Sequence, residues 1–361
     1  MDASDARYSL PAALADRPWR RHAANLASPP PTMLMQPELD LLHWLTSQYY
    51  QGQGLIIDAG CFLGGSTSAL ASGLATNPAA HGRKRLIHCY DLFSTSGKLW
   101  YDFLPQFNLG RDQSFEDRFR RNVAAHAERI EVHAGELLEQ TWGQEPVEIL
   151  FLDICKFPPL HDHATRLWFP RLIPGRSILI QQDYGWWDYH WGNIMMEVYR
   201  DRFAVLDDVP VASRVYLCTH AISESEAAER VYARLSEVDK LRHMDAAIAS
   251  VGHSSYREHL WLNAAELAKT LGREDLIKRA LVEIFSNPSP GPAGASARER
   301  FPQYFAGAGT LAAAAPPPPP PAPQPPAATG RRLDRPAASR GSLSSRFARL
   351  WRKVRRAVGS R

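Results

Sequence analysis

The sequence predicts an α/β fold in which a doubly wound, mostly parallel β-sheet carries an antiparallel edge strand and is followed by a helical extension. Short apolar runs rich in β-branched residues alternate along the chain with longer segments of helical periodicity. This alternation is typical of parallel strands joined by helices that cover both faces of a sheet. The last two apolar runs are too close together for a connecting helix, so we expect them to pair antiparallel at one edge.

The expected elements follow one another in chain order. Strands are expected at residues 55–59, 86–91, 130–133, 147–154, 177–182, 203–206 and 211–218, and helices at 41–50, 66–75, 114–126, 161–169 and 194–200. Residues 221–286 keep apolar side chains at helical spacing, which predicts an all-helical extension after the sheet.

Composition and charge restrict the class of protein. Hydrophobic residues make up 45% of the chain and charged residues 22%, which is typical of a folded globular protein. No apolar run approaches the ~20 residues that cross a bilayer, and the N-terminal residues lack the apolar core of a signal peptide. The four cysteines are far apart and form no CxxC motif, so they predict neither a zinc site nor a disulfide framework. We therefore expect a cytoplasmic protein.

The C-terminal part differs in composition from the rest. Of the 28 prolines, 14 fall between Pro288 and Pro336, in a stretch that cannot bury enough apolar surface to fold. Residues after Gly330 hold 11 of the 42 Lys and Arg residues but one of the 38 Asp and Glu residues, so the basicity belongs to the tail and we expect no nucleic-acid partner. Within residues 342–361, apolar and basic residues alternate as in a basic amphipathic helix. Such a helix suits an anionic membrane surface or an acidic protein partner, and a disordered tail is the alternative.

A glycine-rich segment follows the first expected strand. Residues 54–67 read GLIIDAGCFLGGST, with Asp58 at the strand end, a turn containing Gly60 and Gly64, and Ser66 at the start of a helix. Glycine lets a backbone approach a ligand closely, and a helix N-terminus offers free N–H groups. The segment predicts a cofactor cradle, and a tight turn without a ligand is the alternative.

Further acids follow the later strands. The second strand ends at Asp91, whose carboxylate could accept hydrogen bonds from two ribose hydroxyls. Asp153 follows the fourth strand and Asp183 the fifth. The carboxyl ends of parallel strands share one edge of a sheet, where doubly wound folds bind ligands, so we expect these acids to lie near the glycine turn. An acid at a strand end can also simply cap the next loop or helix.

The glycine spacing behind Asp58 is G-x-x-x-G-G, which departs from the G-x-G-x-x-G dinucleotide fingerprint. It resembles the first motif of class I S-adenosylmethionine-dependent methyltransferases. The placement of the strand-end acids, across roughly residues 50–190, resembles the macrocin O-methyltransferase family within that class. The resemblance implies methyl transfer from S-adenosylmethionine to a small polar acceptor such as a sugar hydroxyl. The cofactor-binding residues that it implies are Asp58, Gly60, Gly64, Ser66, Asp91 and Gly135.

The same resemblance implies the catalytic residues. Asp153 would be the general base and Asp183 would orient the acceptor, directly or through a Mg²⁺ ion held by both. Apart from the resemblance, His190 is the reserve candidate for the base. The family carries two consecutive Asp residues where this chain has Gln182 and Asp183, and another acid is replaced near Lys156. The loss of acids weakens a Mg²⁺ site, and Lys156 could itself balance the charge of Asp153. A non-catalytic binding or scaffold protein and an NAD-type oxidoreductase are the alternative functions.

These expectations divide the chain into five parts. They are an N-terminal arm (1–34), an S-adenosylmethionine-binding domain (35–220), a helical extension (221–287), a proline-rich linker (288–341) and the basic helix (342–361). Aromatic residues crowd the segment after Asp183, where they could form an acceptor platform, fill the core or contact a second copy. The sequence leaves the oligomeric state open.

Overall fold

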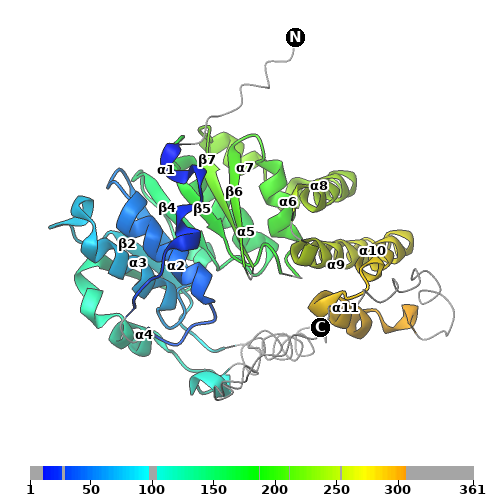
Figure 1. Ribbon diagram of the computed structural model, residues 1–361, viewed down its shortest axis with the longest axis horizontal. Coiled ribbons are helices and arrows are strands. Elements are labelled where there is room, and N and C mark those ends of the chain that lie inside the picture. Colours follow the sequence, from blue (N-terminus) through cyan, green and yellow to red (C-terminus); the bar gives the residue numbers. More distant parts are fainter. Residues whose placement is uncertain are drawn as a thin grey trace, which may run out of the picture.

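A seven-stranded sheet lies at the centre of the computed structural model, which describes residues 11–26, 29–96, 104–186, 188–210, 212–252 and 254–305 (Figure 1). The strands are β1 (Leu55–Ala59), β2 (Ile87–Asp91), β3 (Ile130–Ala134), β4 (Val147–Leu152), β5 (Ile178–Gln181), β6 (Phe203–Val209) and β7 (Ser213–Cys218). Their order is β3-β2-β1-β4-β5-β7-β6. Strands β1 to β5 are parallel, and β7 runs antiparallel to both β5 and β6. The predicted α/β fold and its antiparallel edge are confirmed.

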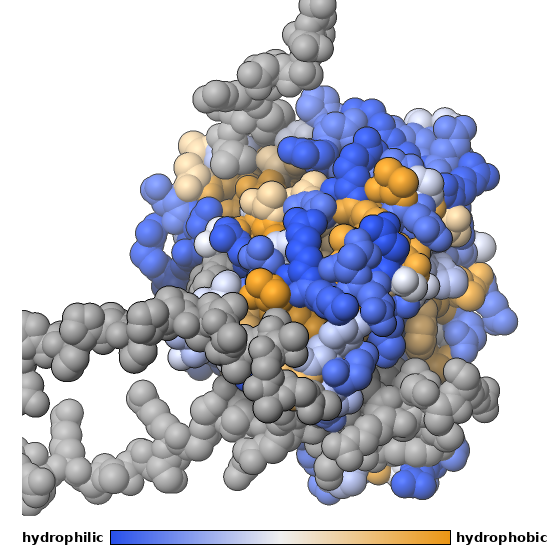
Figure 2. Space-filling model, turned by 90° about the vertical axis from the view of Figure 1, so that its right-hand side faces the viewer, coloured by the Kyte–Doolittle hydropathy of each residue, from blue (hydrophilic) through white to orange (hydrophobic). Residues whose placement is uncertain are grey.

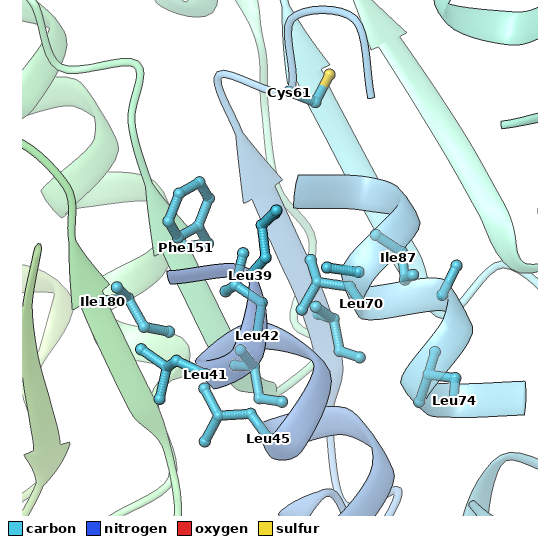
Figure 3. Packing of buried hydrophobic residues seen from close by; sticks show 14 of the residues in the cluster. Leu39, Leu41, Leu42, Leu45, Cys61, Leu70, Leu74, Ile87, Phe151 and Ile180 are labelled. Carbon is cyan, nitrogen blue, oxygen red and sulfur yellow. The ribbon is translucent and has the colours of Figure 1, made fainter. Parts of the chain in front are cut away.

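Helices cover both faces of this sheet. The longer helices of the sheet domain are α2 (Gln36–Trp44), α3 (Gly65–Thr76), α4 (Glu116–Asn122), α5 (Pro158–Trp168) and α6 (His190–Val198). Alternate residues of a strand point to opposite faces, and Ile56 accordingly packs in one buried cluster while Ile57 packs in another. On the first face, leucines of α2 and α3 meet Phe151 and Ile180 of the sheet (Figure 3). The second cluster joins the opposite face to α5 and α6.

The C-terminal helices gather beside α6 (Figure 1). They are α7 (Glu224–Glu229), α8 (Glu237–Ser250), α9 (Ser254–Thr270), α10 (Glu274–Ser286) and α11 (Gly291–Arg300). Residues 291–300 are helical, and Phe301 is fully buried against Leu281 and Ile284. The prediction that the linker starts at residue 288 therefore places its start too early. Pro292 stands in the first turn of α11, where its missing N–H costs no hydrogen bond. The outer surface of these helices is mostly hydrophilic, with scattered hydrophobic residues (Figure 2).

The described part of the N-terminal arm is fastened to the edge strand β6. Asp207 accepts hydrogen bonds from the Trp19 indole at 2.8 Å and from Arg20 Nε at 2.8 Å, and Arg17 adds an ion pair at 3.3 Å. Trp19 and Asp207 are both buried. In the part of the chain that the structure describes, no helix is long and apolar enough to cross a membrane. The basic segment 342–361 and most of the predicted linker lie outside the described residues.

Candidate functional site

The acids singled out from the sequence lie at the carboxyl ends of neighbouring strands. Asp58 and Asp91 belong to β1 and β2, Asp153 directly follows β4, and Asp183 lies two residues after β5. Asp91, Asp153 and Asp183 are partly exposed, whereas Asp58 is fully buried. Because β1 lies between β2 and β4 in the sheet, these strand ends form one continuous edge.

Gly60 lies where three strand ends meet. Its N–H donates to the Tyr90 carbonyl at 2.8 Å, and the Asp153 N–H donates to the Ala59 carbonyl at 2.8 Å. Gly60 has a φ of +95°, and an added Cβ would lie 2.7 Å from the carbonyl carbon of Asp153. Both the left-handed backbone and the close approach of the β4 end require glycine here.

Asp58 is held by the first turn of α3. Its Oδ2 accepts hydrogen bonds from Ser66 Oγ at 3.0 Å and Thr67 Oγ1 at 2.5 Å, while its Oδ1 is buried without a hydrogen-bond partner among the described residues. Burial raises the pKa of Asp58 to about 6, although the two hydroxyls favour its charged form. Ser66 is buried and engaged with Asp58, so its side chain fixes the strand end to the helix.

Asp91 joins the glycine turn to the end of β2. Its two carboxylate oxygens accept from the N–H groups of Phe62 and Phe93, each at 2.8 Å. Burial raises the pKa of Asp91, and these two backbone donors oppose that effect. Each carboxylate oxygen can accept more than one hydrogen bond, so the partly exposed side chain keeps capacity for a ligand hydroxyl.

Gly64 and Gly135 differ in what surrounds them. An added Cβ on Gly64 would meet Val123 at 2.6 Å, so this glycine makes room for the protein's own packing. Gly135 has a φ of +117°, its N–H donates to the Asp91 carbonyl at 3.0 Å, and the nearest atom to an added Cβ is Gln140 Nε2 at 3.7 Å. The open side of the site is therefore at Gly135 and Asp91, and Gly64 lies behind it.

Lys156 bridges the two acids that were predicted to be catalytic. Its Nζ lies 2.5 Å from Asp153 Oδ1 and 2.6 Å from Asp183 Oδ2. Burial disfavours the ammonium, but the two carboxylates outweigh it and raise the pKa of Lys156 above its usual value. Burial also raises the pKa of Asp153 to about 7, an effect that Lys156 opposes and the charge of Asp183 adds to. The expectation that Lys156 balances the charge of Asp153 is confirmed, and the bridge to Asp183 extends it.

Glu38 is a buried acid near this pair that the sequence reasoning missed. Its Oε2 accepts from the Met35 N–H at 2.9 Å, and its Oε1 lies 2.7 Å from Ser213 Oγ, which also contacts the amide of Gln182. Burial raises the pKa of Glu38 to about 7, and the charge of Asp183 adds to this. A hydroxyl has one proton to donate, so a proton on Glu38 would complete a chain from Glu38 through Ser213 to Gln182. No sequence signal indicated Glu38, because the predicted helix begins at residue 41, whereas α2 begins at Gln36 and has Glu38 in its first turn.

The helical extension holds the loop that follows Asp183. In α9, the side-chain oxygen of Asn263 accepts from the N–H groups of Asp188 and Tyr189, at 2.5 and 3.1 Å. Its nitrogen donates to the Trp186 carbonyl at 2.9 Å and to Asn193 at 2.7 Å. The sequence indicated no chemistry in this extension, yet one of its side chains ties together both ends of a site loop.

Two further side chains of α9 act on the same loop. His259 Nδ1 lies 2.6 Å from the Gly185 carbonyl, and the Tyr256 hydroxyl donates to the Ser213 carbonyl at 3.1 Å. An added Cβ on Gly185 would lie 2.3 Å from the Tyr256 ring, so the loop fits closely against the helix. Asp183, two residues before Gly185, has a φ of +63°, an uncommon conformation for a non-glycine residue.

The aromatic residues after Asp183 are core residues in the described part of this segment. Trp186, Tyr189 and Trp191 are all buried, and the Trp191 indole donates to the Cys155 carbonyl at 2.9 Å. Of the alternatives that the sequence left open for this segment, these three residues follow core filling. The side chain of Trp187 lies outside the described residues.

His190 is also buried, at the start of α6. Its ring packs edge-on to Trp191 and near Tyr232. Burial, together with the charges of Lys240 and Arg300, lowers the pKa of His190 to about 4. The neighbours of the reserve base are thus core aromatics and cations of the C-terminal helices.

The structure gives no support to the predicted magnesium site. Among the described residues, no group of three or more His, Cys, Asp and Glu side chains is arranged to hold a metal ion. An ammonium group already lies between the carboxylates of Asp153 and Asp183. The donor set therefore does not fit a divalent cation as the chain stands.

Comparisons with known proteins add little. No family model matches the chain, and no curated protein matches it. One solved structure that matches is that of the pyocyanin biosynthetic protein PhzM, with 16% sequence identity and a TM-score of 0.30. The match covers 50% of this chain and 54% of PhzM, so the chain spans about half the length of that protein. A likeness at this level does not bear on function.

Proposed function

We propose that the protein is an S-adenosylmethionine-dependent methyltransferase that acts on an oxygen, with nitrogen as the alternative, of a small polar acceptor such as a sugar. The observation that carries the proposal is the meeting of Gly60 with the partly exposed carboxylates of Asp91, Asp153 and Asp183 at one sheet edge. The carboxyl ends of strands in doubly wound sheets are where ligands bind. The sheet also has the mostly parallel order with an antiparallel edge that the resemblance to class I methyltransferases implies.

The charge at this edge favours a cationic ligand. Asp91, Asp153 and Asp183 face a single described ammonium, that of Lys156, so negative charge is in excess. A sulfonium cofactor gains from such a field, whereas the pyrophosphate of NAD would be repelled by it. The electrostatics therefore support S-adenosylmethionine over the oxidoreductase alternative.

Strained backbone also occurs at the same edge. Phe62, Phe93 and Asp183 follow β1, β2 and β5, and all have positive φ values, of 45°, 50° and 63°. Positive φ is an outlier for a bulky residue such as phenylalanine, and strain of this kind tends to cluster at functional sites. This supports a binding role for the edge beyond that of a structural cap.

The chain's own residues can perform the proton transfer that methylation of a hydroxyl needs. When bound, the cofactor supplies a methyl group on a positively charged sulfur. Lys156 holds Oδ1 of Asp153, which leaves Oδ2 to accept the proton of the acceptor. A pKa raised to about 7 suits Asp153 to act as a base near neutral pH. Asp183, fixed by the same ammonium, would orient the acceptor.

Titration calorimetry with S-adenosylmethionine, S-adenosylhomocysteine and NAD tests the proposal. We expect the two sulfur compounds to bind and NAD not to bind. Asp91→Ala should weaken S-adenosylhomocysteine binding by about 10- to 100-fold, because it removes charged acceptors worth roughly 1.5–3 kcal/mol. Asp117→Ala, an exposed acid in α4, is the matched control. Thermal unfolding would verify that both variants are folded, since Asp91 also holds Phe62 and Phe93.

Unchanged affinity in a folded Asp91→Ala variant would refute the placement of the cofactor. Binding of NAD alone would favour the oxidoreductase. Binding of S-adenosylmethionine without transfer to any of a panel of sugars and phenols would favour the non-catalytic alternative, in which the edge keeps a ligand site but lacks a reaction.

A further inference from the structure

We propose that the ammonium of Lys156 is the resident cation of this acid pair, in the place that a divalent metal ion would take between Asp153 and Asp183. The resemblance drawn from the sequence implied such a metal, and the side chains present do not fit one. The inference goes beyond the proposed function, because it concerns the charge between two carboxylates whether or not the chain transfers a methyl group.

The bridge has the geometry of a bound cation. The Nζ atom lies 2.5 and 2.6 Å from one oxygen of each carboxylate, so it joins the end of β4 to the loop after β5. A divalent ion placed between the two carboxylates would take the position of the ammonium, which would have to leave first. An ammonium offers three donors, of which the two acids use two.

The lysine is held in place by its backbone as well as by the acids. Its N–H donates to the Ile154 carbonyl at 2.8 Å, and the carbonyl of the preceding residue, Cys155, accepts from the Trp191 indole at 2.9 Å. These two hydrogen bonds fix the backbone at Lys156 and directly before it. Lys156, Asp153 and Asp183 are all largely shielded from solvent, with side-chain exposures of 28%, 19% and 16%. Such shielding reduces the screening by water and salt that makes an exposed ion pair weak.

The side chains around the acid pair also favour a singly charged cation over a divalent one. Mg²⁺ is usually bound through one or two carboxylates and several waters, and here both carboxylates already contact the ammonium. The position next to Asp183 adds no third carboxylate, because it is the uncharged Gln182, whose amide is engaged by Ser213. The third acid nearby, Glu38, is held by Ser213 and the Met35 N–H, and is thus turned to other partners. With Lys156 in place, a cation already lies between the two carboxylates, and the ammonium occupies the position that a divalent ion would need.

Manganese titration tests this proposal, with the free Mn²⁺ signal in electron paramagnetic resonance as the readout. The full chain should bind no Mn²⁺ at about 1 mM, the weak end of protein carboxylate sites. Lys156→Ala frees both carboxylates and leaves room for an ion, so it should gain Mn²⁺ binding. Adding Asp153→Asn to Lys156→Ala should abolish that gain. Lys156→Arg, which keeps the positive charge, should behave as the full chain does.

Binding of Mn²⁺ by the unaltered chain, lost in Asp153→Asn, would overturn the proposal. A folded Lys156→Ala variant that gains no binding would overturn it as well, because the acid pair would then not be a cation site at all. The measurement on the unaltered chain stands even if Lys156→Ala does not fold. None of these readouts uses S-adenosylmethionine, so a failure of the proposed function and a failure of this inference can be told apart.

Discussion

The buried carboxyl of Glu38 should make the protein less stable as the pH rises. Burial raises its pKa in the folded state from the usual 4.5 to about 7. Between these values the folded state holds a proton that the unfolded chain has released, so the free energy of unfolding falls with increasing pH. The stabilising effect of that proton is complete below pH 4.5 and is lost as the pH rises through 7. Glu38→Gln keeps the size of the side chain and cannot ionise, so it should lack this dependence.

The magnitude follows from the two pKa values. A difference of one unit between the folded and unfolded pKa corresponds to about 1.4 kcal/mol. The contribution of Glu38 to the free energy of unfolding therefore falls by roughly 2–3 kcal/mol between pH 5 and pH 8. Relative to the unaltered chain, Glu38→Gln should therefore gain roughly 2–3 kcal/mol of unfolding free energy on going from pH 5 to pH 8. Urea unfolding followed by tryptophan fluorescence at both pH values measures this difference.

The control is Glu283→Gln, which neutralises an exposed acid on α10 and should give the same difference from the unaltered chain at both pH values. All other titrating groups are shared by the chains compared, so their contributions cancel. If the difference between Glu38→Gln and the unaltered chain also stays constant, Glu38 does not hold its proton in the folded state. The hydrogen-bond chain from Glu38 to Gln182 would then have to be assigned differently.

Two further predictions concern the parts that frame the site. Gly82→Ala should lower the free energy of unfolding by about 1 kcal/mol, and Gly60→Ala should lower it by more. Both glycines have positive φ, but an added Cβ would meet nothing within 4 Å at Gly82, whereas at Gly60 it would lie 2.7 Å from the backbone of Asp153. Equal losses in urea unfolding would contradict the close approach. Asn263→Ala should lower the free energy of unfolding by about 2–4 kcal/mol and speed hydrogen exchange at the Asp188 and Tyr189 amides. Asn263→Asp keeps the acceptor oxygen, so it should keep these amides protected. Unchanged exchange in both variants would show that the loop is held elsewhere.

The fold could be predicted from the sequence because its signals are local. Each strand of the sheet is an apolar run next to a helix with its own periodicity, and the glycine turn with Asp58 marks the first junction. The helix α11 was missed for an equally local reason, since Pro288, Pro290 and Pro292 resemble the start of the proline-rich stretch. Pro292 in fact lies in the first turn of a helix, and only the burial of Phe301 against α10 distinguishes the two cases.

The site was predictable only in part, because its remaining contacts join distant segments. The acids at the strand ends are placed by the parallel topology itself. Glu38, by contrast, meets Ser213 at a separation of 175 residues, and Asn263 reaches Asp188 across 75. Neither pairing leaves a periodic signal in the sequence. Lys156 lies three residues from Asp153, which is why that contact could be anticipated and the second one, to Asp183, could not.

The attachment of the N-terminal arm to β6 bears on how copies of the protein can associate. An outer strand presents unpaired backbone groups that a second chain could extend into a larger sheet. In β6 the register shifts between Val205 and Asp207, and the buried Asp207 is clasped by Trp19 and Arg20. A bulged strand anchored to its own arm is a poor template for another strand, because bulges twist an edge away from flat pairing. The arm thus opposes aggregation by addition of a strand to β6, the edge strand at the end of the sheet farthest from β3.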